Sequence, residues 1–185
     1  MTNTMDAQTA FIIAQAISII TGVVAIVLKQ MKTMRMILLF EVIANLLASS
    51  NYLLLGGDAG ATVSVLAIVQ SLVMYLFNRR ERAVPVAVPA VFIALYVAGS
   101  VYSLISKADP MEIFPAISAV CFAVALTCKK PFFYRSWSVV NALCWIVYDG
   151  YTASYVMMAV HLGILLSTVI AIIRLDARAV RKTGR

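Results

Sequence analysis

Two polar residues interrupt the apolar run ILLFEVIANLLA, and their side chains could do chemistry inside a membrane. Glu41 and Asn45 lie four residues apart, so on a helix they share one face, one turn apart. A carboxylate about 12 Å inside an apolar span, at 1.5 Å per residue, is costly and indicates a group that handles a proton or a polar solute. The alternative is a hydrogen-bonded structural glutamate beside an amide that joins helices.

Other polar side chains interrupt the remaining apolar runs. Asn141 supplies a second amide, and Trp145 follows it by one helical turn. His161, the only histidine, and Gln15 could line an outer vestibule. A direct ion pair between His161 and Glu41 is one alternative, but their expected depths differ by about 8 Å, which favours water or solute between them.

We therefore predict a substrate-binding set that combines amides, titratable groups and aromatic rings. The aromatic members have an alternative role as anchors at the membrane interface. The predicted binding residues are Asn45, Asn141, Glu41, Gln15, His161, Gln70, Trp145 and Tyr148, and Asp149 is a further candidate.

Pro115 could act as a hinge in the fifth apolar run, because proline removes a backbone hydrogen bond from a helix interior. A static kink is the alternative. The three cysteines, Cys121, Cys128 and Cys144, lie in or at the ends of apolar stretches and are expected to be small buried hydrophobes. Without a metal-ligand spacing, a paired nucleophile and base, or a phosphate-binding loop, we expect no metal, no cofactor and no enzymatic activity.

The elements that position these residues follow from composition and hydropathy. With 63% hydrophobic and 12% charged residues among 185, the chain is too apolar for a soluble domain. Runs of about 20 apolar residues predict membrane-spanning helices, so the fold class is an all-α membrane protein with seven transmembrane helices. The predicted spans are 8–29, 33–55, 59–77, 84–106, 110–128, 134–152 and 154–175.

The distribution of basic residues predicts the orientation. If successive spans cross the membrane in opposite directions, Lys107 lies on one side of the membrane and all the others of the 15 basic residues lie on the opposite side. Because Lys and Arg are retained in the cytosol, this indicates an N-terminus outside and a C-terminus inside. The net charge of +7 lies in clusters between apolar runs, which fits topology signals and lipid headgroup contacts and argues against nucleic acid. The first span lacks a basic leader and is expected to be retained.

The first and second parts of the chain also resemble each other. Ala16-Ile17-Ser18 recurs as Ala116-Ile117-Ser118, and the offset of 100 also matches Lys29 with Lys129 and Arg35 with Arg135. Smaller offsets match Asn45 with Asn141, Tyr52 with Tyr148 and Arg79 with Arg174. Both copies have the same orientation, so one additional helix is needed between them to carry the chain back across the membrane. Parallel repeats of this kind are known in transporters. The predicted organisation is 1–77 as the first triple-helix repeat, 78–106 as a basic cytosolic loop and linking helix, 107–175 as the second repeat and 176–185 as a basic cytosolic tail.

Three short motifs carry a resemblance to a known family. The stretch 53–61 (LLLGGDAGA), the run 144–149 (CWIVYD) and the ending 172–176 (IIRLD) resemble the YgjV family of small bacterial inner-membrane proteins. The three-one-three helix plan is similar to that of the SWEET sugar facilitators and PQ-loop transporters. The chain departs from the family pattern at His161 and Asp149, and it has no proline-glutamine pair, because Gln15 follows Ala14 and Pro115 follows Phe114.

Together these features favour a multi-pass protein of the bacterial inner membrane that moves a small polar solute by alternating access. The substrate is not specified, and a link to protons is left open. The alternative is a non-transporting accessory or sensor protein whose polar groups only hold helices together. Expected partners are the lipid bilayer and the solute. A homo-oligomer is left open, since one chain contains both predicted repeats.

Overall fold

The computed structural model describes residues 7–54, 58–107, 110–151 and 155–176. These residues form seven α-helices and no strand, because a continuous apolar segment in lipid must satisfy its backbone hydrogen bonds within itself. The helices are α1 (Ala7–Leu28), α2 (Met34–Leu54), α3 (Asp58–Arg79), α4 (Ala87–Lys107), α5 (Ile113–Thr127), α6 (Pro131–Tyr151) and α7 (Tyr155–Ala171). A 3-10 turn, η1 (Pro110–Glu112), precedes α5, and a π-helical segment, η2 (Ile172–Asp176), continues α7.

The helices begin and end close to the predicted spans, with one difference that matters for the site. Four segments are long and apolar enough to cross a membrane: Gln8–Leu28, Met34–Asn51, Ala87–Ser106 and Met157–Asp176. Helix α6 begins at Pro131 rather than at residue 134, because proline fits the first helical position, where its missing N–H has no acceptor. Tyr134 and Arg135 therefore lie one turn inside the helix rather than at its start.

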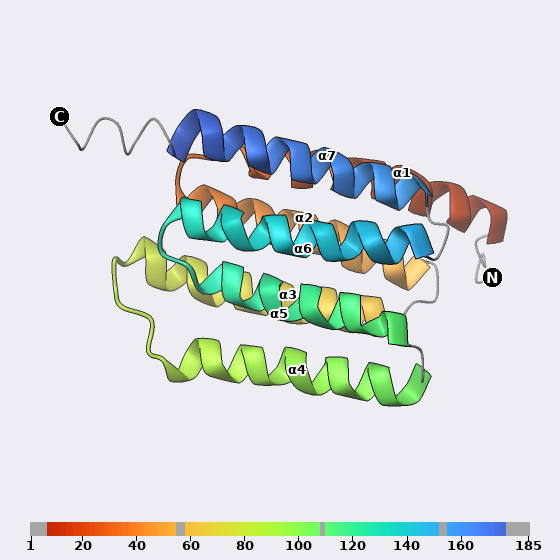
Figure 1. Ribbon diagram of the computed structural model, residues 1–185, viewed down its shortest axis with the longest axis horizontal. Coiled ribbons are helices and arrows are strands. Elements are labelled where there is room, and N and C mark those ends of the chain that lie inside the picture. Colours follow the sequence, from red (N-terminus) through yellow and green to blue (C-terminus); the bar gives the residue numbers. More distant parts are fainter. Residues whose placement is uncertain (1–6, 55–57, 108–109, 152–154, 177–185) are drawn as a thin grey trace, which may run out of the picture.

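The helices lie roughly parallel in two rows (Figure 1). Helices α1, α2 and α3 form one row with α2 in the middle, and α7, α6 and α5 form the other with α6 in the middle. Contacts of α1 with α7 and of α3 with α5 join the rows. Helix α4 packs on α5 at the edge.

This arrangement is compatible with the predicted duplication. Exchanging α1 with α5, α2 with α6 and α3 with α7 turns the α1–α7 contact into the α5–α3 contact, so the same two pairs join the rows after the exchange. We call α1–α3 the first half and α5–α7 the second half. The three-one-three plan and the orientation in the membrane stay predictions.

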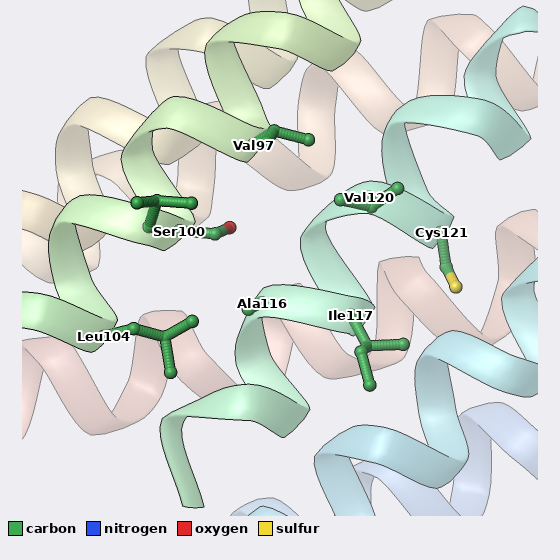
Figure 2. Close-up of a pocket in the computed structure, with 8 residues that line it drawn as sticks. Val97, Ser100, Leu104, Ala116, Ile117, Val120 and Cys121 are labelled. Atoms are coloured by element: carbon green, nitrogen blue, oxygen red, sulfur yellow. The ribbon is translucent and has the colours of Figure 1, made fainter. Parts of the chain in front are cut away.

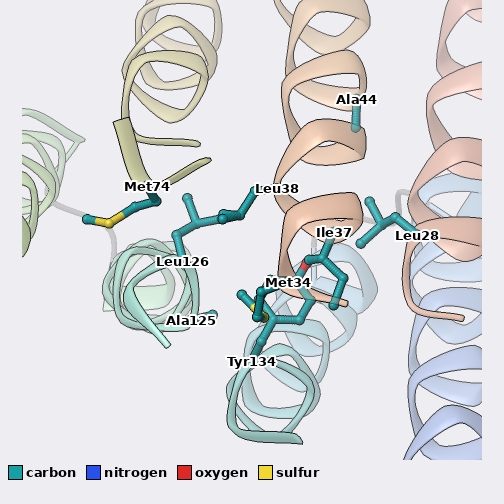
Figure 3. Packing of buried hydrophobic residues seen from close by; sticks show 9 residues of the cluster. All are labelled: Leu28, Met34, Ile37, Leu38, Ala44, Met74, Ala125, Leu126 and Tyr134. Atoms are coloured by element: carbon teal, nitrogen blue, oxygen red, sulfur yellow. The ribbon is translucent and has the colours of Figure 1, made fainter. Parts of the chain in front are cut away.

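The connections α1–α2, α3–α4 and α5–α6 all lie at one end of the bundle (Figure 1), which we call the basic end because it carries Lys32, Arg80, Arg82, Lys129 and Lys130. Near this end the rows are joined by a tightly packed apolar cluster (Figure 3). Its buried members are Leu28, Met34, Ile37, Leu38, Ala44, Met74, Ala125, Leu126 and Tyr134. Large apolar side chains elsewhere, such as Ile19, Leu46 and Leu166, are exposed, as expected where lipid is the solvent.

Candidate functional site

A buried polar network crosses from the first half to the second near the basic end. Lys29, the residue after the end of α1, donates from Nζ to the Tyr134 hydroxyl at 2.6 Å and to Ser138 Oγ at 3.2 Å. The same Nζ lies 3.6 Å from Oε1 of Glu41 on α2. The Tyr134 hydroxyl donates to Glu41 Oε1. Helices α1, α2 and α6 therefore meet at one carboxylate, and we call these four residues the Glu41 network.

The Glu41 network is almost closed to solvent. The side chains of Lys29 and Glu41 are 8% and 6% exposed. The Lys29 Nζ also lies 4.5 Å from the centre of the Tyr134 ring, so the aromatic face adds to its stabilisation. Burying two charges is costly, and their mutual attraction compensates only when hydrogen bonds satisfy the remaining donors and acceptors. Tyr134 and Ser138 supply those bonds here.

Asn45 extends the Glu41 network one turn further along α2. Its Nδ2 donates to the Glu41 backbone oxygen at 2.8 Å and to Glu41 Oε2 at 3.2 Å, so the two residues share a helix face as their spacing predicts. Both Glu41 carboxylate oxygens are thus engaged, one by Tyr134 and Lys29 and the other by Asn45. Asn45 is half-buried.

Arg135 fixes the turn that carries Lys29. The fully buried guanidinium donates to the backbone oxygens of Lys29, at 2.9 Å, and of Met31. It also forms a two-oxygen pair with Asp176 of η2 at 2.8 Å. A planar guanidinium can satisfy this set of acceptors at once, which a lysine cannot. Arg135 therefore positions the α1–α2 turn, and with it the Lys29 ammonium, against α6.

A second polar cluster lies at the other end of the bundle, between α6 and α7. His161 Nδ1 lies 2.7 Å from Asp149 Oδ2, and both side chains are largely buried. The Trp145 ring stacks on the imidazole with centroids 5.5 Å apart and an interplanar angle of 7°, and Tyr148 meets Trp145 edge-on at 5.9 Å. Because Asp149 takes the His161 contact, the two titratable residues His161 and Glu41 belong to separate clusters.

The amides of Asn141 and Gln70 join helices. Asn141 Nδ2 donates to the backbone oxygen and the Oγ of Ser118, at 3.0 and 2.8 Å. Asn51, rather than Asn45, makes the matching bond in the first half, to Ser18 Oγ at 3.0 Å. Gln70 is fully buried and donates to the backbone oxygen of Ala123 at 2.9 Å. These contacts are the interhelical bonds that were the alternative to solute binding.

Gln15 and Pro115 lie apart from both clusters. The Gln15 side chain is exposed, whereas its neighbour Ala14 is fully buried. Pro115 is the third residue of α5 and lies in the first helical turn, where backbone N–H groups have no acceptor within the α-helix. The expected loss of a hydrogen bond from the helix interior therefore does not arise there. A hinge at Pro115 stays a prediction.

An open groove between α4 and α5, of about 280 Å³, contains none of the predicted binding residues (Figure 2). Its lining is apolar apart from Ser100 and includes Cys121. Among the described residues, no group of three His, Cys, Asp or Glu side chains could hold a metal ion.

Sequence reasoning missed Lys29, Tyr134 and Ser138 as partners of Glu41. Lys29 was counted with the basic loops and Tyr134 was placed at a helix end. One signal did exist: a carboxylate at the depth of Glu41 needs a cation or hydrogen-bond donors, and lysines at span ends have long side chains that reach inward. Which lysine takes this place could not be read from the chain, since Lys29 is buried and its repeat partner Lys129 is exposed.

Comparison with known proteins gives one match. The family model Imp-YgjV, described as a bacterial inner membrane protein, matches residues 12–179. No curated protein and no solved structure matches the chain.

Proposed function

Because the chain belongs to the Imp-YgjV family of bacterial inner membrane proteins, we propose that it transports a small polar solute between its two halves. The protein is a multi-pass inner-membrane protein. We infer that all seven helices cross the membrane as three, one and three, with α4 linking two repeats of the same orientation. The basic end then lies in the cytosol, in keeping with the retention of Lys and Arg on that side.

The observation that carries the proposal is the Glu41 network. A protein that only needs to stay in the membrane gains nothing from a buried Lys29–Glu41 pair, since each intramembrane charge costs about 2.5 to 3.5 kcal/mol on insertion scales. The network lies where the two halves meet, and its contacts to Tyr134 and Ser138 cross between them. Polar contacts of this kind can break and re-form when two packed units rock.

The apolar cluster and the Glu41 network together close the basic end. Both contain Tyr134, whose side chain belongs to the apolar cluster (Figure 3). Its hydroxyl donates to Glu41. Opening toward the cytosol would separate α6 from α1 and α2 and so break the contacts of Tyr134 and Ser138 with Lys29. Asn45 lies one helical turn further from the basic end than Glu41. A solute that enters from the opposite end would therefore reach Asn45 before it reached the closed basic end. In this mechanism the network is the inner gate and Asn45 lies beside the solute.

A second reading, a non-transporting accessory or sensor protein, is favoured by the interhelical bonds of Asn141 and Gln70. In that reading the Glu41 network only locks helices together. The two readings differ in one measurable property, which is solute movement by the purified protein.

The experiment is uptake and counterflow in liposomes that contain the purified protein, with a panel of sugars, nucleosides, amino acids and vitamins, with and without a pH gradient. We expect saturable uptake of one solute class and loss of that uptake in Asn45→Ala. Leu143→Ala, at an exposed position of α6, is the control for handling and reconstitution. If no solute in the panel moves with wild-type protein, the transport proposal fails and the accessory reading takes its place.

Asn141 needs a matched pair of variants because its amide also joins α5 to α6. Ser118→Ala removes the Oγ acceptor but leaves Asn141 in place. If Asn141 contacts the solute, Asn141→Ala stops uptake and Ser118→Ala does not. Equal losses in both variants would show that Asn141 acts only by joining helices.

A further inference from the structure

Three buried oxygens on α3 and α4 are left over by the contacts described above. One is Ser71 Oγ, and the other two belong to side chains that contact α5. Gln70 Oε1 and the Tyr96 hydroxyl have no hydrogen-bond partner among the described residues. Gln70 is fully buried and Tyr96 is 3% exposed, so neither oxygen is free to reach bulk solvent. An unpaired polar group in a membrane interior is costly, because the surrounding lipid offers no hydrogen bonds.

The two oxygens lie at the same level of the bundle. Gln70 is nine residues before the end of α3 and Tyr96 is nine residues after the start of α4, and both of those helix ends lie at the basic end. Glu41 is seven residues after the start of α2, at the same end. At 1.5 Å per residue, all three lie about 10 to 14 Å from the basic ends of their helices.

Both side chains contact neighbouring residues of α5. Gln70 Nε2 donates to the backbone oxygen of Ala123 at 2.9 Å. The Tyr96 ring meets the ring of Phe122, the preceding residue, edge-on with centroids 6.4 Å apart and an interplanar angle of 81°. Both side chains therefore reach the same turn of α5.

We propose that Gln70 Oε1 and the Tyr96 hydroxyl form a buried hydration site that holds ordered water at α5. A bound water donates to Gln70 Oε1, and its oxygen accepts from the Tyr96 hydroxyl, so both leftover oxygens are satisfied. The site lies among α3, α4 and α5, away from the contacts of Glu41 with Lys29 and Tyr134. It would give α4, the helix outside both halves, a polar connection to the interior. This proposal does not depend on transport.

Thermal unfolding of Tyr96→Phe tests the site, because a water-bound hydroxyl and an unpaired hydroxyl predict different changes in the midpoint temperature of unfolding. The variant keeps the ring that packs on Phe122 and removes only the hydroxyl. If the hydroxyl binds water, its removal leaves that water short of a donor, and the midpoint falls by about 2 to 6 °C. If the hydroxyl is unpaired, its removal relieves a cost and the midpoint stays or rises. Tyr102→Phe, on the same helix and 75% exposed, is the control and should leave the midpoint unchanged.

A double-mutant cycle with Gln70→Leu tests whether the two oxygens share one site. Gln70→Leu also breaks the bond to Ala123, but that loss is present in both arms of the cycle and cancels. Shared water predicts that Tyr96→Phe has a clearly smaller effect in the Gln70→Leu background than in wild type. Equal effects in both backgrounds would overturn the shared site.

Radiolytic hydroxyl labelling measures the water directly, because buried side chains that contact ordered water are oxidised in place. We expect labelling of Tyr96 in the folded protein and less labelling of Tyr134, whose hydroxyl is fully engaged by Lys29 and Glu41. An unlabelled Tyr96, together with a midpoint that rises in Tyr96→Phe, would refute the hydration site.

Discussion

Removing the Lys29 ammonium tests the physical basis of the Glu41 network. The Nζ–Oε1 separation is 3.6 Å, and at an effective dielectric constant of about 20 the attraction is about 5 kcal/mol. Part of that attraction offsets the cost of burying both charges. Lys29→Met removes the attraction and leaves the Glu41 carboxylate buried with only Tyr134 and Asn45, so we expect the free energy of unfolding to fall by about 3 to 5 kcal/mol.

Matched variants separate the energy of the Lys29–Glu41 pair from the effects of each side chain on its other neighbours. Glu41→Gln should destabilise as well, because it leaves the Lys29 ammonium buried without a carboxylate. The double variant Lys29→Met/Glu41→Gln has no buried unpaired charge and should be at least about 2 kcal/mol more stable than the sum of the single effects predicts. Lys129→Met is the control, since Lys129 is the repeat partner of Lys29 and is exposed.

Unfolding by sodium dodecyl sulfate in mixed micelles, followed by circular dichroism, gives these free energies on one scale. Additive single effects would refute a coupled pair. A Lys29→Met effect no larger than that of Lys129→Met would refute the burial argument itself.

Three further predictions use the same assay. Arg135→Lys should lose about 2 kcal/mol or more, because lysine cannot bind two backbone oxygens and both Asp176 oxygens together; equal stability would contradict the positioning role. Gly22→Ala should be about 1 kcal/mol less stable than Gly99→Ala, since a Cβ at Gly22 would lie 3.1 Å from Val160 Cγ1 whereas nothing lies within 4 Å of one at Gly99. Glu81 has a φ of 54°, so Glu81→Gly should raise stability by up to about 1 kcal/mol while Glu81→Gln, which keeps the strain, should not. The Glu81 carboxylate lies 3.0 Å from the Arg35 guanidinium, and a loss of stability in both variants would show that this exposed pair matters more than the strain.

The number of helices could be predicted because the bilayer imposes a length and an apolar composition on each span. The chain alternates long apolar runs with short basic or glycine-containing breaks, and the structure places a helix in each predicted span. The start of α6 was harder to predict, because proline usually ends a helical pattern but also fits its first position. This error of three residues placed Tyr134 and Arg135 at the start of the helix rather than one turn inside it.

The pairing of polar groups could not be predicted, because spacing along one helix says nothing about the residue that faces it. Glu41 and Asn45 were placed on one face by their four-residue spacing, and they do contact each other. The repeat suggested Asn45 and Asn141 as equivalent residues, but Asn51 makes the bond that corresponds to that of Asn141. Likewise Lys29 and Lys129 match in the sequence and differ in burial.

The sequence by itself determined that this is a helical membrane protein with polar groups inside its helices, because hydropathy and charge act on each segment independently of the rest of the chain. Only the tertiary structure decided that Lys29, Tyr134 and Ser138 surround Glu41, that Asp149 holds His161 at the other end, and that Gln70 and Tyr96 approach the same turn of α5. These choices depend on which helices pack together and how each is rotated about its axis. Side-chain packing sets that rotation. The sequence does not indicate it, because many different apolar residues could fill the same space.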